Sequence, residues 1–121
     1  MRLEMQKIGH SAKTVACAFE GVRLEGQVRR VAPKFFVLEG RLHGEVAVVC
    51  ARSAEIFNKT LSQDLKLLLC DGMFDPKQGL EGLGVDALDT IECFDGIIDF
   101  EDILRSEVQS IQADYHYLDQ A

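Results

Sequence analysis

The residues of this chain that are suited to nucleophilic or metal chemistry are its cysteines and histidines, and their spacing does not assemble a site. A structural zinc site needs ligands at close, paired spacing to preorganise a tetrahedron. The four cysteines and three histidines are instead scattered: Cys17, Cys50, Cys70, Cys93, His10, His43 and His116. No Ser/His/Asp set or carboxylate pair stands out either. We therefore expect no catalytic residues, no metal and no cofactor, and reduced cysteines that mostly pack in the core.

Two segments imitate ligand-binding motifs without meeting their chemical requirements. The stretch 95–102 is similar to the second half of a calcium-binding EF-hand loop, but Ile91 and Cys93 stand where the first two carboxylates are needed. The glycine-rich string 79–84 lacks the Lys-Ser/Thr pair of a phosphate-binding loop and has acidic neighbours. The first segment is predicted to be a turn followed by a helix cap.

Charge gives the strongest functional signal in the sequence. The 121-residue chain has a net charge of −7, which argues against nonspecific coating of nucleic acid. Residues 1–66 contain 11 Lys/Arg and 7 Asp/Glu, whereas residues 67–121 contain 2 Lys/Arg and 13 Asp/Glu. This asymmetry suggests a charged partner for one half. Six residues are candidates for a phosphate-binding surface, with solvated strand faces as the alternative: Arg23, Arg29, Arg30, Lys34, Arg41 and Arg52.

These side chains belong to a half of the chain, 1–70, that is predicted to be rich in strands. Segments 14–19 and 22–31 flank Glu20-Gly21, a pair typical of a tight hairpin turn. The second segment alternates apolar and polar residues, as a half-buried antiparallel strand does. By this alternation Arg23 and Arg29 share a strand face.

A second turn is predicted at Pro33-Lys34. Residues 35–50 then form one long strand, or two strands joined near Gly40 or Gly44, with Arg41 on the odd, polar face. Residues 55–70 fit a strand and a helix about equally, and the preceding strands favour a strand.

The second half is predicted to contain one helix. An acidic, glycine-rich loop covers 71–95, a helix covers about 99–112 with Asp99 as its N-cap, and a short tail covers 113–121. The helix has one apolar stripe, formed by Phe100, Ile103, Leu104, Val108 and Ile111. We therefore expect a single α+β domain over 1–121 that is mainly β. Its twisted antiparallel sheet or partly closed barrel has the C-terminal helix packed on it.

The chain shows no membrane or export signal. Its longest apolar run, 46–51, is far shorter than a bilayer span, and Arg2, Glu4 and Lys7 interrupt any apolar N-terminal region. We expect a cytoplasmic protein that does not associate with membranes. The oligomeric state is left open.

Three passages, taken in order, resemble a known family. Residues 40–53 resemble a glycine-bearing strand that ends in a Cys-x-Arg-Cys knuckle, and 71–95 resemble a variable acidic insertion. Residues 95–107 resemble an aspartate-capped helix that leads to a short tail. Together they resemble the YceD-like family of bacterial and plastid proteins, linked to accumulation of large-subunit 23S ribosomal RNA. The acidic half and its tail are similar to the Campylobacter and Helicobacter version.

The residues that match the family motifs are Cys50, Arg52, Asp95, Gly96 and Asp99. The sequence departs from the pattern at Ser53, which takes the place of the second knuckle cysteine. Any chemistry of a cysteine pair there would be lost in this chain. Cys50 is interpreted as a buried strand-end residue, and Arg52 either closes the turn or faces a phosphate.

The resemblance implies a non-enzymatic ribosome-biogenesis factor that binds rRNA and supports its accumulation. In this hypothesis the six basic residues cluster on one face, and RNA affinity falls steeply with salt. The alternative is a protein–protein adaptor whose acidic half binds a basic partner such as a ribosomal protein. This alternative predicts weak binding to naked RNA, with the acidic stretch 71–102 as the interface.

Overall fold

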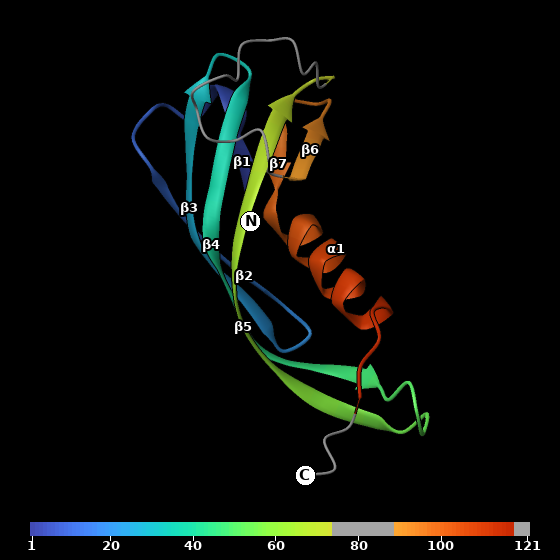
Figure 1. Cartoon of the computed structure of the whole chain (residues 1–121). Coiled ribbons are helices and arrows are strands. Elements are labelled where there is room, and N and C mark those ends of the chain that lie inside the picture. Colours follow the sequence, from blue (N-terminus) through green and yellow to red (C-terminus); the bar gives the residue numbers. More distant parts are fainter. Residues whose placement is uncertain (74–88, 118–121) are drawn as a thin grey trace.

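The computed structural model, in which residues 1–73 and 89–117 are described, contains a twisted five-stranded sheet with one helix packed on it (Figure 1). The strands follow in the order β2-β3-β4-β5-β6, and the sheet is open. Their bounds are Lys13–Phe19 (β2), Val22–Ala32 (β3), Phe35–Val49 (β4), Ile56–Asp71 (β5) and Asp89–Cys93 (β6). The predicted mainly β fold with a C-terminal helix is confirmed. The sheet is not closed into a barrel.

The hairpins form where the sequence supplies the turn residues. Glu20 and Gly21 have φ angles of 46° and 85°, which a two-residue hairpin turn with the right twist requires. β4 runs unbroken through Gly44, so the prediction of one long strand holds rather than that of two. Residues 56–71 form a strand and not a helix. β4 and β5 therefore build the long hairpin that extends beyond the rest of the sheet in Figure 1.

A pair of glycines lets β3 and β4 approach closely. Gly26 and Gly40 lie opposite each other in the β3–β4 register. A Cβ atom at Gly26 would lie 2.2 Å from the carbonyl oxygen of Glu39, and one at Gly40 would lie 2.5 Å from that of Glu25. Real Cβ atoms do not approach a carbonyl so closely, so any side chain at these positions would push the strands apart.

The single α-helix of the described residues, α1 (Phe100–Ala113), begins as the sequence predicts. The side chain of Asp99 accepts a hydrogen bond from the backbone N–H of Asp102 at 3.2 Å, which caps the first turn. Phe100, Ile103, Leu104 and Val108 are buried against the sheet, and Ile111 packs against the same cluster. This main core lies between α1 and the face of the sheet that carries the even residues of β3 and β4.

A smaller buried cluster lies on the other face of the sheet. Phe35, Val37, Leu68 and Cys70 are all at most 2% exposed there. Phe36, one residue along, is buried in the main core instead, because successive residues of a strand point to opposite faces. Both phenylalanines therefore pack in the interior, as expected, rather than presenting rings for base stacking.

The second half of the chain contains more strand than the sequence indicated. Within 71–95, predicted as a loop, β6 pairs with β5, and this pair is parallel rather than antiparallel. Residues 74–88 of that predicted loop lie outside the described residues. A further antiparallel pair, β1 (Arg2–Glu4) with β7 (Ile97–Asp99), and a short 3-10 helix, η1 (Met5–Lys7), were not predicted. Three-residue strands are too short to produce a recognisable alternation of residue types.

Candidate functional site

The face of β3, β4 and β5 opposite the helix, here called the open face, carries three of the six candidate basic residues, all of them arginines. Each is paired with a carboxylate of the same face. Arg23 lies 3.5 Å from Glu25, and Arg29 lies 3.6 Å from Glu39. Arg41 faces Asp64 on the neighbouring strand at 3.5 Å. The predicted placement of these arginines on the polar faces of their strands is confirmed. They alternate with acidic residues, however, and do not form a continuous basic surface.

The open face of these three strands is electrically balanced. Two further pairs complete its network: His43 lies 3.3 Å from Glu25, and Lys66 lies 3.9 Å from Glu39. Four Lys/Arg and four Asp/Glu share the face, namely Arg23, Arg29, Arg41, Lys66, Glu25, Glu39, Glu45 and Asp64. Phosphate binding there would have to compete with these carboxylates.

Arg30 faces the other way and has a structural role. Its guanidinium donates hydrogen bonds to the carbonyl oxygens of Ile8 and Met5, each at 3.0 Å, and to that of Pro33. It also stacks on the ring of Phe36, 4.6 Å from the centroid. The side chain therefore ties the N-terminal segment to β3.

The remaining two candidates lie at separate places. Lys34 is exposed in the β3–β4 turn, and its carbonyl oxygen accepts a bond from the N–H of Asp71. Arg52 lies in the turn after β4, at the far end of the long hairpin, over the ring of Tyr117 at 5.5 Å. The prediction that all six basic residues cluster on one face is therefore wrong. Alternation of residues along a strand does not report which cations are paired across strands or turned toward another segment.

The family-motif residues build turns and ends of elements. Cys50 is buried at the end of β4, where its N–H donates to the carbonyl of Glu55 and its backbone bridges to His116. Asp95 accepts a bond from the N–H of Ile97 at 3.1 Å, and Gly96 has a φ of 71°, a conformation that favours glycine. With Asp99 as N-cap, these positions form the predicted turn and cap.

Three of the four thiols, those of Cys17, Cys70 and Cys93, are poorly suited to nucleophilic chemistry. Burial, reinforced by acidic neighbours, raises the pKa of Cys70 and Cys93, and burial likewise raises the pKa of Cys17. Thiolates are the reactive form, so these groups are protonated at neutral pH. No group of three or more His, Cys, Asp and Glu in the described parts of the chain is arranged to hold a metal ion. None of the described helices is long and apolar enough to cross a membrane.

An acidic groove lies between β6, β7 and the start of α1. It has a volume of about 500 Å³. It is lined by Ile91, Glu92, Cys93, Phe94, Asp95, Ile97, Asp99, Asp102 and Ile103. Among these residues, Phe94 is 74% exposed. The nine lining residues are together called the acidic groove. Sequence reasoning predicted acidity for this region but missed the groove, because β6 and β7 were not predicted.

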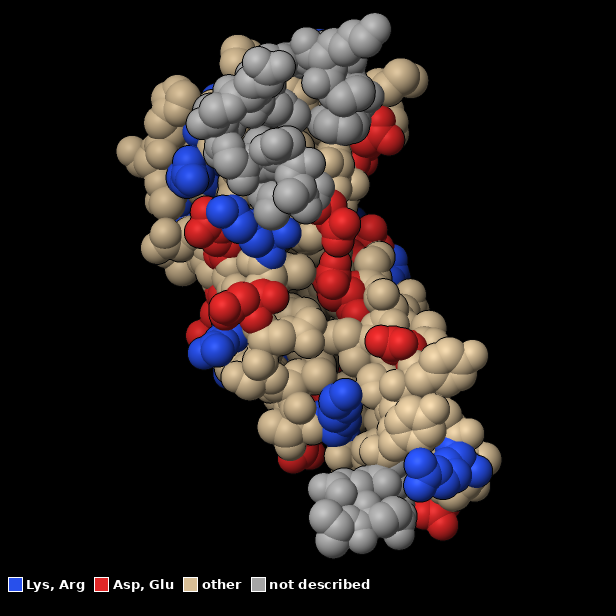
Figure 2. All heavy atoms as spheres, viewed as in Figure 1, with Lys and Arg blue, Asp and Glu red and all other residues tan. Residues whose placement is uncertain are grey.

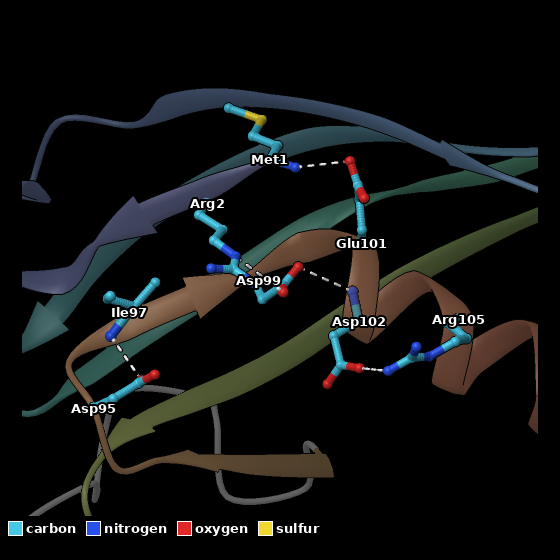
Figure 3. A network of polar contacts seen from close by, with 8 residues as sticks. All are labelled: Met1, Arg2, Asp95, Ile97, Asp99, Glu101, Asp102 and Arg105. Carbon is cyan, nitrogen blue, oxygen red and sulfur yellow. Dashed lines mark hydrogen bonds and ion pairs between the residues drawn. The ribbon is translucent and has the colours of Figure 1, made fainter.

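Asp99 and Asp102 of the groove have cationic partners (Figure 3). Arg2 lies 3.3 Å from Asp99, and Arg105 pairs with Asp102 one helical turn on. The N–H of Asp102 bonds to Asp99, which lowers the pKa of the Asp99 carboxyl with a further contribution from Arg2. Asp99 is therefore ionised at neutral pH.

The acidity extends beyond the groove. Residues 89–117 contain eight Asp/Glu and a single Arg. Burial raises the pKa of Glu107 on α1, and the nearby Asp89 on β6 raises it further. Figure 2 shows acidic side chains gathered alongside α1, whereas both signs are interspersed over the strands on the other side. This surface would attract a cationic partner and repel phosphates.

Comparisons with known proteins add no identification. No protein-family model matches this chain, and no curated protein and no solved structure matches it. The resemblance to the YceD-like family therefore rests on the sequence passages alone.

Proposed function

We propose that this chain is a non-enzymatic ribosome-biogenesis factor of the YceD-like kind that acts chiefly as a protein-binding adaptor. Its acidic groove would bind a basic partner, such as a ribosomal protein of the large subunit. The proposal rests on one observation: acidic residues and an exposed aromatic residue, Phe94, line the same groove.

The composition of the groove suits a basic, amphipathic segment. Isoleucine side chains and Phe94 offer apolar contacts, and Asp95, Asp99 and Asp102 add carboxylates to the same groove. Buried aromatic anchors dominate the affinity of interfaces, and complementary charge speeds association. Binding should therefore depend on Phe94 and weaken as salt rises.

Direct contact with large-subunit rRNA is the second candidate. It is favoured by Arg52 and Tyr117, which place a guanidinium and an aromatic ring together at the end of the long hairpin. Tyr117 is 58% exposed. Cationic and aromatic side chains of this kind hold single-stranded nucleic acid by charge and stacking. Accumulation or processing of 23S rRNA would then follow from binding by either surface.

The test is sedimentation of the tagged protein from lysate of its native host, with and without RNase. Two variants separate the surfaces: Asp102→Lys with Phe94→Ala for the groove, and Arg52→Ala with Tyr117→Ala for the hairpin end. Asp64→Lys makes the same charge change as Asp102→Lys on the open face, where Asp64 also pairs with an arginine, and serves as the matched control.

Co-migration with large-subunit precursors that survives RNase and is lost in the groove variant supports the adaptor function. Co-migration lost on RNase treatment and in the Arg52/Tyr117 variant supports rRNA binding instead. Wild-type protein that stays at the top of the gradient in every condition contradicts both.

A further inference from the structure

β2 is an edge strand of unusual composition. It forms one border of the five-stranded sheet, and no other described strand pairs with its outer side. Natural edge strands are protected by charges, proline or bulges, which prevent pairing with another chain. After Lys13, β2 has none of these: its exposed side chains are Thr14, Ala16 and Ala18.

The hairpin fixes which backbone groups of β2 point outward. Phe19 and Val22 flank the two-residue turn, so they form the hydrogen-bonded pair that closes it. Hydrogen-bonded and non-bonded pairs alternate along an antiparallel ladder. The N–H and C=O groups of Thr14, Ala16 and Ala18 therefore point away from β3.

We propose that two copies of this chain associate through antiparallel pairing of their β2 strands. In the register centred on Ala16, each copy's Ala16 lies opposite the other's, and Thr14 lies opposite Ala18. This register uses all three outward-pointing residues, giving about six backbone hydrogen bonds across a two-fold axis. The five-stranded sheets of the two copies then form one continuous sheet.

Side-chain size and charge fit this register. The facing pairs on the open face are alanine with alanine and threonine with alanine, which leave the backbones free to approach. Lys13 of one copy lies beside the Phe19–Glu20 end of the other, so opposite charges meet at both ends. The contact area is small, so the dimer should be weak and concentration-dependent.

The experiment measures the oligomeric state of the full chain by sedimentation equilibrium over a wide concentration range. Ala16→Lys places two like charges opposite each other on the axis and should weaken the dimer by roughly tenfold or more. Thr60→Lys, an exposed open-face change on β5, which β3 and β4 separate from β2, should leave the association unchanged. Thermal melts monitor the folding of both variants.

A cysteine cross-link tests the register directly. In a Cys17→Ser background, Ala16→Cys should form an intermolecular disulfide on mild oxidation, because hydrogen-bonded partners are about 5.5 Å apart at Cα. Ala18→Cys, opposite Thr14, should not. A wild-type chain that is monomeric at every concentration overturns the proposal. A dimer that is insensitive to Ala16→Lys and not cross-linked through Ala16→Cys does so equally.

Discussion

Replacing Arg30 by alanine tests whether this arginine stabilises the fold or is available to bind a ligand. The sequence places Arg30 among six candidates for phosphate binding, but its guanidinium binds three carbonyl oxygens of its own chain. The matched control is Arg29→Ala, the adjacent residue on the opposite face of β3. There the lost contact is an exposed ion pair with Glu39 at 3.6 Å.

The expected size of the effect follows from these contacts. Hydrogen bonds to charged groups contribute about 1.5–3 kcal/mol each. Two of the bonds from Arg30 are partly buried, and at the lower value they contribute about 3 kcal/mol together. For a chain of 121 residues that loss lowers the Tm by about 12 °C. An exposed pair such as that of Arg29 contributes less than about 1 kcal/mol.

Urea and thermal unfolding of both variants provide the assay. Arg30→Lys should recover less than half of the lost stability, because a single ammonium cannot match the fork of a guanidinium between separate carbonyls. If Arg30→Ala and Arg29→Ala differ by less than about 1 kcal/mol in unfolding free energy, the structural assignment of Arg30 is refuted.

Three further predictions concern stability. Gly40→Ala would bring a methyl group 2.5 Å from a carbonyl oxygen of β3 and should lower the unfolding free energy by about 3 kcal/mol in urea melts, whereas Gly9→Ala, with open space around it, should change little. Burial raises the pKa of the Glu107 carboxyl, so its ionised form penalises folding above the folded-state pKa, and the penalty disappears below the unfolded-state pKa. Glu107→Gln should therefore raise the urea midpoint at neutral pH, and an equal gain in strong acid would contradict this sign. His116→Ala removes a buried ring bonded to a carbonyl of the last helical turn and should cost about 1–2 kcal/mol, against little change for the exposed Tyr115→Ala.

The sequence predicted the fold where local chemistry decides the structure. Glu20-Gly21 specifies a hairpin turn, and Asp99 specifies the start of a helix, since each acts on its immediate neighbours. β6 was missed because its five residues form a strand only by pairing with β5, a contact distant in sequence. β1 and β7 were missed for the same reason, each having only three residues.

The candidate site was less predictable than the fold, because it depends on which charges meet. The alternation of side chains along a strand correctly placed Arg23 and Arg29 on one face. It cannot show that Glu25 and Glu39 lie within ion-pair distance of them. The acidic half was recognised from composition alone. Its groove required knowledge of β6 and β7, which position Phe94 and its acidic neighbours.

The two faces of the sheet have different consequences for a charged partner. A polyanion that approaches the open face meets equal numbers of cations and anions on β3–β5, so each phosphate contact at Arg41 is made at the expense of Asp64. On the α1 side, residues 89–117 contribute eight acidic residues and one arginine, and Arg2 and the N-terminal amine pair with Asp99 and Glu101, so an excess of negative charge remains. Long-range attraction scales with the uncompensated charge, whereas paired charges contribute mainly at short range. The electrostatic preference of this molecule is therefore for a basic partner on the α1 side, with any RNA contact left to side chains outside the paired network, such as Lys34 and Arg52.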